Sequence, residues 1–198
     1  MTIKLAGVVE AAAAYTIRRA INMAAQALTA ATAAVITGSC VEIPSGGTGL
    51  ASGAVYKMKL ALDKTGAGTA TSSYALGVVA SGTDETVAAN YTTLLTFTKP
   101  AGTAAADEGT IEIELLFKTV STVAEGGSIL AEFVLVHNLA ATGHAQVPVV
   151  VLAASDTSTA TILTGFAGGH IAVIATTGAS DVSSVHYAEA ELLIPAAA

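Results

Sequence analysis

Residues 111–115 read Ile-Glu-Ile-Glu-Leu, and this alternation is the clearest guide to the fold. Successive side chains of a β-strand point to opposite faces, so the isoleucines and the leucine share one face and Glu112 and Glu114 share the other. One apolar face and one charged face are typical of a strand that packs on a core and also meets solvent. The stretch therefore predicts a β-strand whose two carboxylates lie on a solvated face.

Outward from residues 111–115, the chain beyond Val35 shows strands separated by turn clusters. Glycine-rich pieces such as 45–49 and 125–127 interrupt the apolar runs and are typical of turns. The expected strands are 35–43, 54–62, 74–80, 91–98, 110–120, 128–139, 147–153, 159–164, 170–176 and 184–194. Many short strands without long helical crossovers predict a mainly β fold, an antiparallel β-sandwich or jelly roll.

Two of the apolar runs, 147–152 and 171–174, carry apolar side chains on both faces. A strand of this kind is covered twice, once by the core and once by something else. We expect that second cover to be a partner molecule.

Residues 10–34 differ from the rest because they are mostly Ala with Gln, Met, Leu and Arg, which are good helix formers. Apolar side chains recur there at spacings of three and four, which places them on one face of a helix. These residues are Ala14, Ile17, Ile21, Ala24, Leu28, Ala31 and Val35. The pattern predicts an N-terminal α-helical arm over residues 1–36, ending near Thr37-Gly38, in front of a β-sandwich body over residues 37–198.

The seven residues of this stripe form the candidate interface. Three of them are Ala, so the stripe buries little apolar surface and needs something to lie on. That surface is either the protein's own sheet or a symmetry copy or neighbouring protein.

The charge content is low for a soluble protein. Of the 198 residues, 53% are apolar and 12% are charged, and the net charge is −7; soluble domains usually carry about 25% charged residues. The apolar content excludes a disordered chain, and we expect much of the surface to be covered by copies of the chain or by a partner. Only 8 Lys and Arg and no Trp argue against nucleic acid. The longest uncharged stretch, 20–41, has few large aliphatic residues, which argues against a membrane span.

Motifs that carry chemistry are missing from the sequence. There is no G-x-S-x-G elbow and no P-loop, and the four histidines lack the spacing of metal ligands. The histidines are His137, His144, His170 and His186, and His137 and His186 fall in expected strands. The sequence therefore predicts no catalytic residue, no cofactor and no metal site, and the protein is not expected to be an enzyme.

The carboxylate pairs are expected to be solvated and the single cysteine to be packed, with no chemical role. Glu112 and Glu114 are about 7 Å apart by strand rise, a separation seen in glycosidases but also on any solvated strand. The pairs Asp84-Glu85 and Asp107-Glu108 are expected in turns, where weak Ca²⁺ binding is the alternative to simple solvation. Cys40 is alone, so it forms no internal disulfide and is expected to pack as a small hydrophobe.

Three segments, 11–34, 46–53 and 166–174, carry a resemblance to known proteins through their Ala, Gly, Thr and Val content. With a helical arm before a β-rich body, the chain resembles virion structural proteins of tailed bacteriophages, most closely capsid decoration (cement) proteins and head-fibre bases. The resemblance implies a homo-oligomer, with a trimer favoured, that binds the major capsid protein. It also implies a place on the capsid surface of the virion after assembly in the host cytoplasm.

Three other functions remain open at this point. A different virion role, as coat, tail tube or fibre protein, fits the same composition. An extracellular β-protein of the S-layer or fimbrial type would also be rich in Thr and poor in charge. A carbohydrate-binding or hydrolytic jelly roll needs an aromatic-lined cleft, and the chain offers 5 Tyr, 4 Phe and no Trp.

Overall fold

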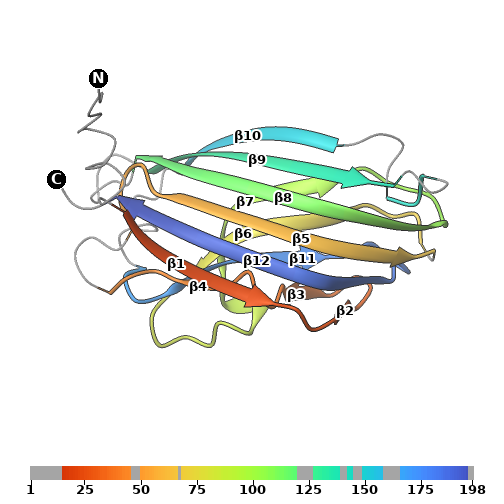
Figure 1. Cartoon of the computed structure of the whole chain (residues 1–198), viewed down its shortest axis with the longest axis horizontal. Coiled ribbons are helices and arrows are strands. Elements are labelled where there is room, and N and C mark those ends of the chain that lie inside the picture. Colours follow the sequence, from red (N-terminus) through yellow and green to blue (C-terminus); the bar gives the residue numbers. More distant parts are fainter. Residues whose placement is uncertain are drawn as a thin grey trace, which may run out of the picture.

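Two antiparallel sheets pack face to face in the part of the chain that the structure describes (Figure 1). The structure is a computed structural model. It describes residues 15–45, 50–66, 68–119, 127–138, 142–144, 149–157 and 166–195. The mainly β fold predicted from the sequence is confirmed as a two-sheet antiparallel β-sandwich, and no described helix is long and apolar enough to cross a membrane.

The larger sheet contains most of the long strands. Its order is β1 (Tyr15–Asn22), β12 (Ser183–Pro195), β5 (Val55–Thr65), β8 (Ala106–Thr119), β9 (Gly127–His137) and β10 (Val149–Thr157), and β2 (Gln26–Leu28) also pairs with β12. The smaller sheet has the order β3 (Ala33–Val35), β11 (His170–Thr176), β6 (Ser72–Val79) and β7 (Thr92–Lys99), and β4 (Val41–Glu42) also pairs with β11. A short 3-10 helix, η1 (Ala88–Asn90), precedes β7.

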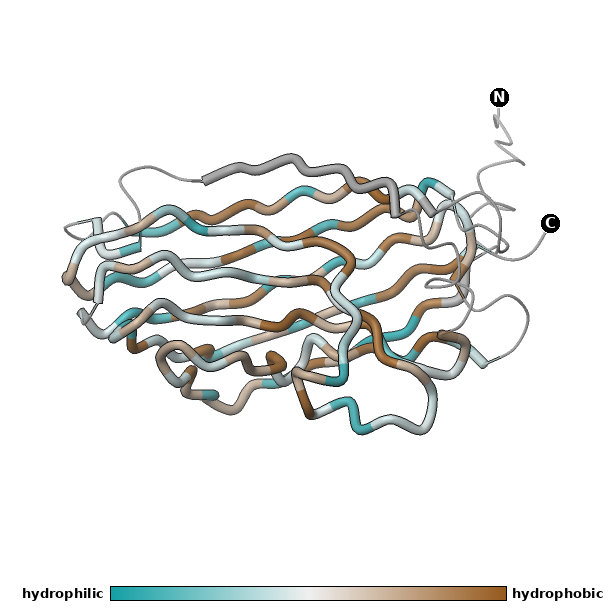
Figure 2. The backbone as a smooth tube through the Cα atoms, turned by 180° about the vertical axis from the view of Figure 1, so that it is seen from behind, coloured by the Kyte–Doolittle hydropathy of each residue, from teal (hydrophilic) through white to brown (hydrophobic). Residues whose placement is uncertain are grey.

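The core lies between the two sheets and is held by interleaved side chains. Phe97 of β7 stacks on Phe133 of β9 with 5.2 Å between ring centroids, and Tyr74 of β6 lies 5.5 Å from the same ring. These aromatic contacts therefore join the smaller sheet to the larger one. Figure 2 shows hydrophobic and hydrophilic residues interleaved along the strands, as expected for sheets buried on one face.

The alternation in residues 111–115 is confirmed. Ile111, Ile113 and Leu115 are buried in the core, whereas Glu112 and Glu114 are exposed on the outer face of the larger sheet. β11 also matches its predicted range of 170–176 at both ends. The predicted strand 35–43 is interrupted, because β3 ends at Val35 and β4 covers only Val41–Glu42. The predicted strand 159–164 lies outside the described residues.

The predicted helical arm is wrong over residues 15–35, and residues 1–14 lie outside the described residues. β1 pairs with β12 without interruption from Tyr15↔Pro195 to Asn22↔Ala188, β2 adds to the same sheet, and β3 joins the smaller sheet. This sheet pairing overrides the helix propensity of the alanines, because such propensity is only a weak preference. Within 15–22, Tyr and β-branched residues favour a strand.

Polar side chains close the turns that follow β1. Asn22 accepts a hydrogen bond from the Ala24 N–H at 3.1 Å and donates to the Ala24 carbonyl at 2.8 Å, which bends the chain after β1. Gly38 has a φ of +90°, and a Cβ there would lie 2.7 Å from the Ala188 carbonyl oxygen. The predicted stop near Thr37-Gly38 is therefore a glycine-requiring turn against β12, and no helix ends there.

β11 is covered on both faces by the chain itself. Ala172 and Ile174 point away from the core, yet both are buried. Tyr91, which follows η1, lies at this outer face, because a Cβ added at Gly77 would meet both the Ile174 side chain at 2.9 Å and Tyr91 Cβ at 3.0 Å. The second cover of 171–174 is thus intramolecular, and the partner expected there is not needed to cover this run. The side chains of the other such run, 147–152, lie outside the described residues.

Candidate functional site

The outer face of the larger sheet carries two rows of charged side chains, which we call the charged rows. The antiparallel register aligns outward-facing residues of β1, β12, β5, β8 and β9 across the sheet. The first row is Arg19, Glu191, Lys57, Glu114 and Glu132, and the second is Ile21, Glu189, Lys59, Glu112 and Val134. Basic and acidic side chains alternate along most of each row.

Three ion pairs link neighbouring strands within these rows. Lys59 Nζ lies 2.7 Å from Glu112 Oε1, and Lys57 Nζ lies 3.0 Å from Glu114 Oε2. Arg19 Nε lies 3.2 Å from Glu191 Oε2. Each of these side chains is partly or largely exposed, so the pairs contribute little to stability and the face is solvated.

A shallow hollow of about 430 Å³ lies over the charged rows. Its lining contains no aromatic residue among the described ones, and Glu112 and Glu114 are each held by a lysine. The structure thus supports the solvated-face interpretation of this carboxylate pair. The stacking platform that sugar binding was expected to need is not present in this hollow.

β1 forms an exposed edge of the larger sheet, and we call Ile17, Arg19, Ile21 and Met23 the β1 edge. One side of β1 pairs with β12, and no described strand pairs with the other. Ile17 is 51%, Ile21 61% and Met23 77% exposed. Natural sheet edges are usually protected by prolines, bulges or charges. β1 has charges in Arg18 and Arg19, but it contains no proline and pairs with β12 without a bulge. Among the described residues, this side of β1 is therefore unpaired.

The seven candidate interface residues do not share one face. Ile17 and Ile21 lie together on the outer side of β1, whereas Leu28 is buried in the core. Ala24 is exposed in the turn after β1, and Ala31 adopts a left-handed backbone with a φ of 54°. Val35 is half-buried in β3, and Ala14 lies outside the described residues. Only the isoleucines of β1 stay candidates for a contact surface.

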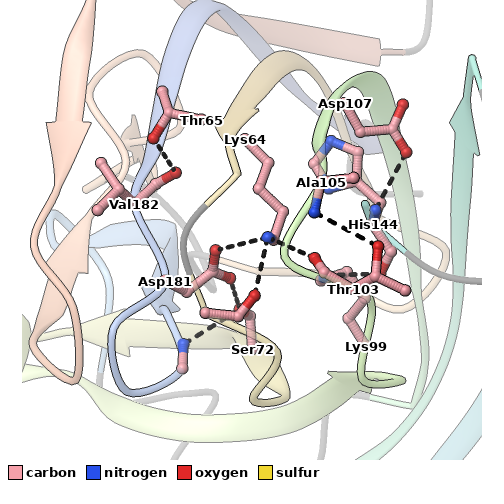
Figure 3. A network of polar contacts seen from close by, with 12 residues as sticks. Lys64, Thr65, Ser72, Lys99, Thr103, Ala105, Asp107, His144, Asp181 and Val182 are labelled. Carbon is pink, nitrogen blue, oxygen red and sulfur yellow. Dashed lines mark hydrogen bonds and ion pairs between the residues drawn. The ribbon is translucent and has the colours of Figure 1, made fainter. Parts of the chain in front are cut away.

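A second group of charged residues is buried at one end of the sandwich, and we call it the polar cluster (Figure 3). All its members are at most 8% exposed, and they come from both sheets. They are Lys64 of β5, Ser72 of β6, Lys99 of β7, Asp107 of β8, His137 of β9, His144, and Asp181 before β12.

Lys64 links three segments at this end. Its Nζ donates hydrogen bonds to the Gly68 carbonyl at 2.9 Å and the Thr103 carbonyl at 2.8 Å, and it lies 3.7 Å from Asp181 Oδ1. The Ser72 hydroxyl donates to Asp181 Oδ2 at 3.1 Å. Through Asp181, Lys64 of the larger sheet is thereby linked to Ser72, the first residue of β6 in the smaller sheet.

His144 bridges the two sheets through its backbone. Its N–H donates to Asp107 Oδ2 at 3.0 Å, and its carbonyl accepts a hydrogen bond from Lys99 Nζ at 2.8 Å. The same Asp107 oxygen lies 2.8 Å from His137 Nδ1. Neither ring nitrogen of His144 has a hydrogen-bond partner among the described residues, although the ring is fully buried. The bridge therefore depends on the backbone groups of His144 and not on its imidazole.

Burial and neighbouring charges shift the pKa values of this cluster. Burial opposes ionisation of Asp107, but the hydrogen bonds from the His144 N–H and from His137 outweigh it, so the pKa of Asp107 lies below its usual value. Burial lowers the pKa of His144 to about 4, and nearby Lys99 acts in the same direction. Burial also lowers the pKa of Lys99, against the opposing charge of Asp181.

The geometry of the polar cluster suits a structural role, which is to close one end of the sandwich. Its side chains are withdrawn from solvent, and no group of three metal-ligating side chains occurs among the described residues. Asp107, expected in a turn, is instead buried in β8, where its Oδ1 accepts a hydrogen bond from the Glu108 N–H at 3.0 Å. Asp84 does lie in a turn, and its Oδ1 accepts hydrogen bonds from both the N–H and the hydroxyl of Thr86. The carboxylates of Asp107 and Asp84 are thus engaged within the protein.

Sequence analysis missed the polar cluster, although strand alternation contains a signal for it. The inward side chains of β5 are Tyr56, Met58, Leu60 and Leu62, and Lys64 is the next position of that series. Asp107 likewise continues the inward series of Ile111 and Ile113 on β8. Charged residues that extend an apolar series at a strand end are therefore expected to point between the sheets.

Cys40 is half-buried, with its Sγ 3.5 Å from the Tyr91 hydroxyl. Burial raises the pKa of this thiol, which disfavours the reactive thiolate. The expected role as a small packed side chain is consistent with this position.

No family model matches the chain, and no curated protein matches it. Among solved structures it is similar to a Lotus tetragonolobus seed lectin, at 8% identity and a TM-score of 0.44, covering 91% of this chain and 94% of that one. It is also similar to peanut lectin, at 8% identity and a TM-score of 0.41, covering 91% and 98%. Arcelin-5, a lectin-like defense protein from Phaseolus vulgaris, gives 6% identity and a TM-score of 0.38, covering 90% and 98%. At such TM-scores the similarity does not extend to function.

Proposed function

We propose that the protein is a virion structural subunit, a capsid decoration (cement) protein that associates with copies of itself and binds the major capsid protein of a tailed-bacteriophage shell. The observation that carries this proposal is the β1 edge, where exposed apolar side chains lie along a strand whose second side is unpaired among the described residues. Unpaired strand edges are templates for pairing with another chain.

The energetics of the β1 edge favour assembly. Fully burying a large aliphatic side chain contributes roughly 1.5–3 kcal/mol, and Ile17, Ile21 and Met23 are all more than half exposed. Many copies bound at once on a shell add avidity without any further contact. A structural subunit of this kind needs no catalytic residue.

The charged rows complement this role by setting orientation. They contain five carboxylates and three cations, so the outer face of the larger sheet is net negative. Charge complementarity across an interface governs specificity and encounter rate more than affinity. We infer that a basic surface of the major capsid protein faces this sheet, while the apolar β1 edge supplies binding free energy.

Native mass spectrometry tests the self-association directly. We expect the wild-type chain to be a homo-oligomer and Ile21→Lys to weaken its association about tenfold or more, because each 1.4 kcal/mol lost is a factor of ten. Val182→Lys is the matched control, since Val182 is also an exposed large hydrophobic residue but lies outside β1. A wild-type chain that stays monomeric at every concentration would overturn the self-association.

A point substitution is preferable to truncation here. Deleting residues 1–34 removes β1 and β2 and most of β3, and so damages both sheets. Binding to the shell is tested by co-sedimentation with capsids of the major capsid protein encoded in the same genome. Absence of co-sedimentation would overturn the decoration role, whereas self-association without capsid binding would favour the fibre or S-layer alternatives.

A further inference from the structure

We propose that β1 pairs antiparallel with β1 of a second copy, about a two-fold axis at Ala20, so that the larger sheets of two subunits form one continuous sheet. This inference rests on the proposed function, because it names the occupant of the β1 edge. It differs from the expected trimer, since a pair of identical strands closes at two subunits.

The first argument is the length and regularity of β1. It has eight residues, about 26 Å at 3.3 Å per residue, and its register with β12 contains no shift. A flat edge of this length presents alternate backbone N–H and carbonyl groups to a neighbour along its whole extent. The Asn22–Ala24 hydrogen bonds turn the chain after β1, which limits the pairing region to residues near 15–23.

The second argument is the choice of register. A two-fold axis perpendicular to the sheet keeps outward residues on the outward face, so Ile17, Arg19 and Ile21 of one copy align with the same set of the other. An axis at Arg18 or at Arg19 would place that arginine directly opposite its own copy. Like charges directly opposite each other on a sheet are destabilising.

An axis at Ala20 removes both clashes. Arg19 then lies opposite Ile21 of the second copy, and its methylene stem covers part of that apolar side chain. Ile17 lies opposite Met23 of the second copy, so the two most distant apolar groups of the edge meet. At the centre, Ala20 lies opposite its own copy, where a small side chain permits close approach.

The charged rows are continuous with this arrangement. Ile21 lies between the second copy's Arg19 on one side and Glu189 of β12 on the other. The incoming guanidinium therefore approaches a face that already carries a carboxylate. Arg19 itself keeps its own partner, Glu191, at 3.2 Å. The interface between the two copies of β1 thus places no like charges directly opposite each other.

Disulfide trapping tests the register, in a Cys40→Ser background so that no other thiol takes part. Arg19→Cys with Ile21→Cys places two cysteine pairs directly opposite each other when the axis is at Ala20. The matched control is Ile17→Cys with Ile21→Cys, which cross-links when the axis is at Arg19. Both variants are oxidised under mild conditions, and covalent dimer is measured by non-reducing gel and intact mass.

We expect covalent dimer in most of the first variant and at least a fivefold lower yield in the control. Preferential cross-linking of the control would overturn the axis at Ala20. Because the first variant removes Ile21 and Arg19, the single variant Ala20→Cys gives an independent test, since it cross-links only when Ala20 faces its copy. The expected result is again a covalent dimer.

Native mass spectrometry of the wild-type chain separates the two proposals. A species of twice the 19.5 kDa chain mass supports the strand pairing. A trimer, or a dimer that none of the cysteine variants traps, overturns the strand pairing and leaves the assembly function standing. A monomer overturns both.

Discussion

β5 places lysines in two opposite surroundings on one strand. The side chain of Lys57 is 46% exposed and pairs with Glu114 in the charged rows. The side chain of Lys64, seven residues later, is 2% exposed and lies in the polar cluster beside Asp181. Strand alternation produces the difference, because odd-numbered residues of β5 face solvent and even-numbered ones face the smaller sheet.

This contrast shows that position, more than residue type, decides what a charged side chain does here. An exposed pair is screened by water and salt and contributes about 0–1 kcal/mol. A buried pair contributes little compared with well-packed apolar residues, but removing one partner leaves an uncompensated charge. Residues of the charged rows can therefore be substituted to suit a binding partner at little cost in stability. Residues of the polar cluster cannot, because the fold depends on them.

The largest expected effect is that of Lys64→Met. The substitution leaves Asp181 buried without its cation and removes the donor to the Gly68 and Thr103 carbonyls. We expect the free energy of unfolding to fall by about 3–5 kcal/mol, the range for breaking a buried pair. Denaturant unfolding followed by circular dichroism measures it.

Lys57→Met is the control on the same strand. It makes the same chemical change at an exposed position, so its cost should stay below about 1 kcal/mol. The double variant Lys64→Met with Asp181→Leu should recover much of the loss, because it removes both charges. Equal costs for Lys64→Met and Lys57→Met would show that the polar cluster does not close this end of the sandwich.

The contrast between these regions also explains what the sequence could predict. The strands at 111–115 and 170–176 were recognisable because their apolar and polar positions differ strongly, and tertiary packing reinforces the pattern. The helix over 10–34 is predicted from the Ala-rich composition and from seven apolar residues at spacings of three and four. The spacing of four between Ile17 and Ile21 fits one face of a strand equally well. Pairing with β12 makes residues 15–22 a strand, and this pairing has no local signal in the sequence.

The candidate surfaces were predictable only in part. Ile17 and Ile21 belong to the predicted helical stripe and are exposed, but they lie on a strand. The polar cluster is not predicted from the sequence, because Asp107 is expected in a turn and Lys64 is not singled out, whereas both end inward series of their strands. His144 lies in a connection rather than a strand, so alternation could not have placed it.

The second expected effect is acid destabilisation through His144. Its pKa in the folded chain, about 4, lies below the ordinary value of 6.5, so the unfolded chain takes up this proton first. The contribution of His144 to stability is full above about pH 6.5, falls as the pH drops, and below pH 4 has decreased by about 3 kcal/mol. The charged groups that face the ring are Lys99, Lys64, Asp107 and His137.

His144→Phe tests this assignment because it keeps the backbone bridge and removes the titrating ring. We expect its stability at pH 7 to equal or exceed that of the wild type, since neither ring nitrogen has a partner to lose among the described residues. Its unfolding free energy should change less between pH 6.5 and 4. An unchanged slope in His144→Phe would exclude His144 as the source.

The smallest expected effect concerns the Lys59–Glu112 pair, which has the shortest separation in the charged rows at 2.7 Å. A double-mutant cycle of Lys59→Ala and Glu112→Ala should give a coupling of about 0.2–1 kcal/mol in 0.1 M salt. The coupling should shrink in 1 M salt, where the screening length falls to about 3 Å. Glu189 flanks Lys59 on the other side, so it partly compensates the loss of Glu112 and lowers the coupling further. A coupling above about 2 kcal/mol would mean that the charged rows stabilise the sheet well beyond the range of exposed ion pairs. The rows could then not adapt to a partner at little cost, and the orienting role proposed for them would fail.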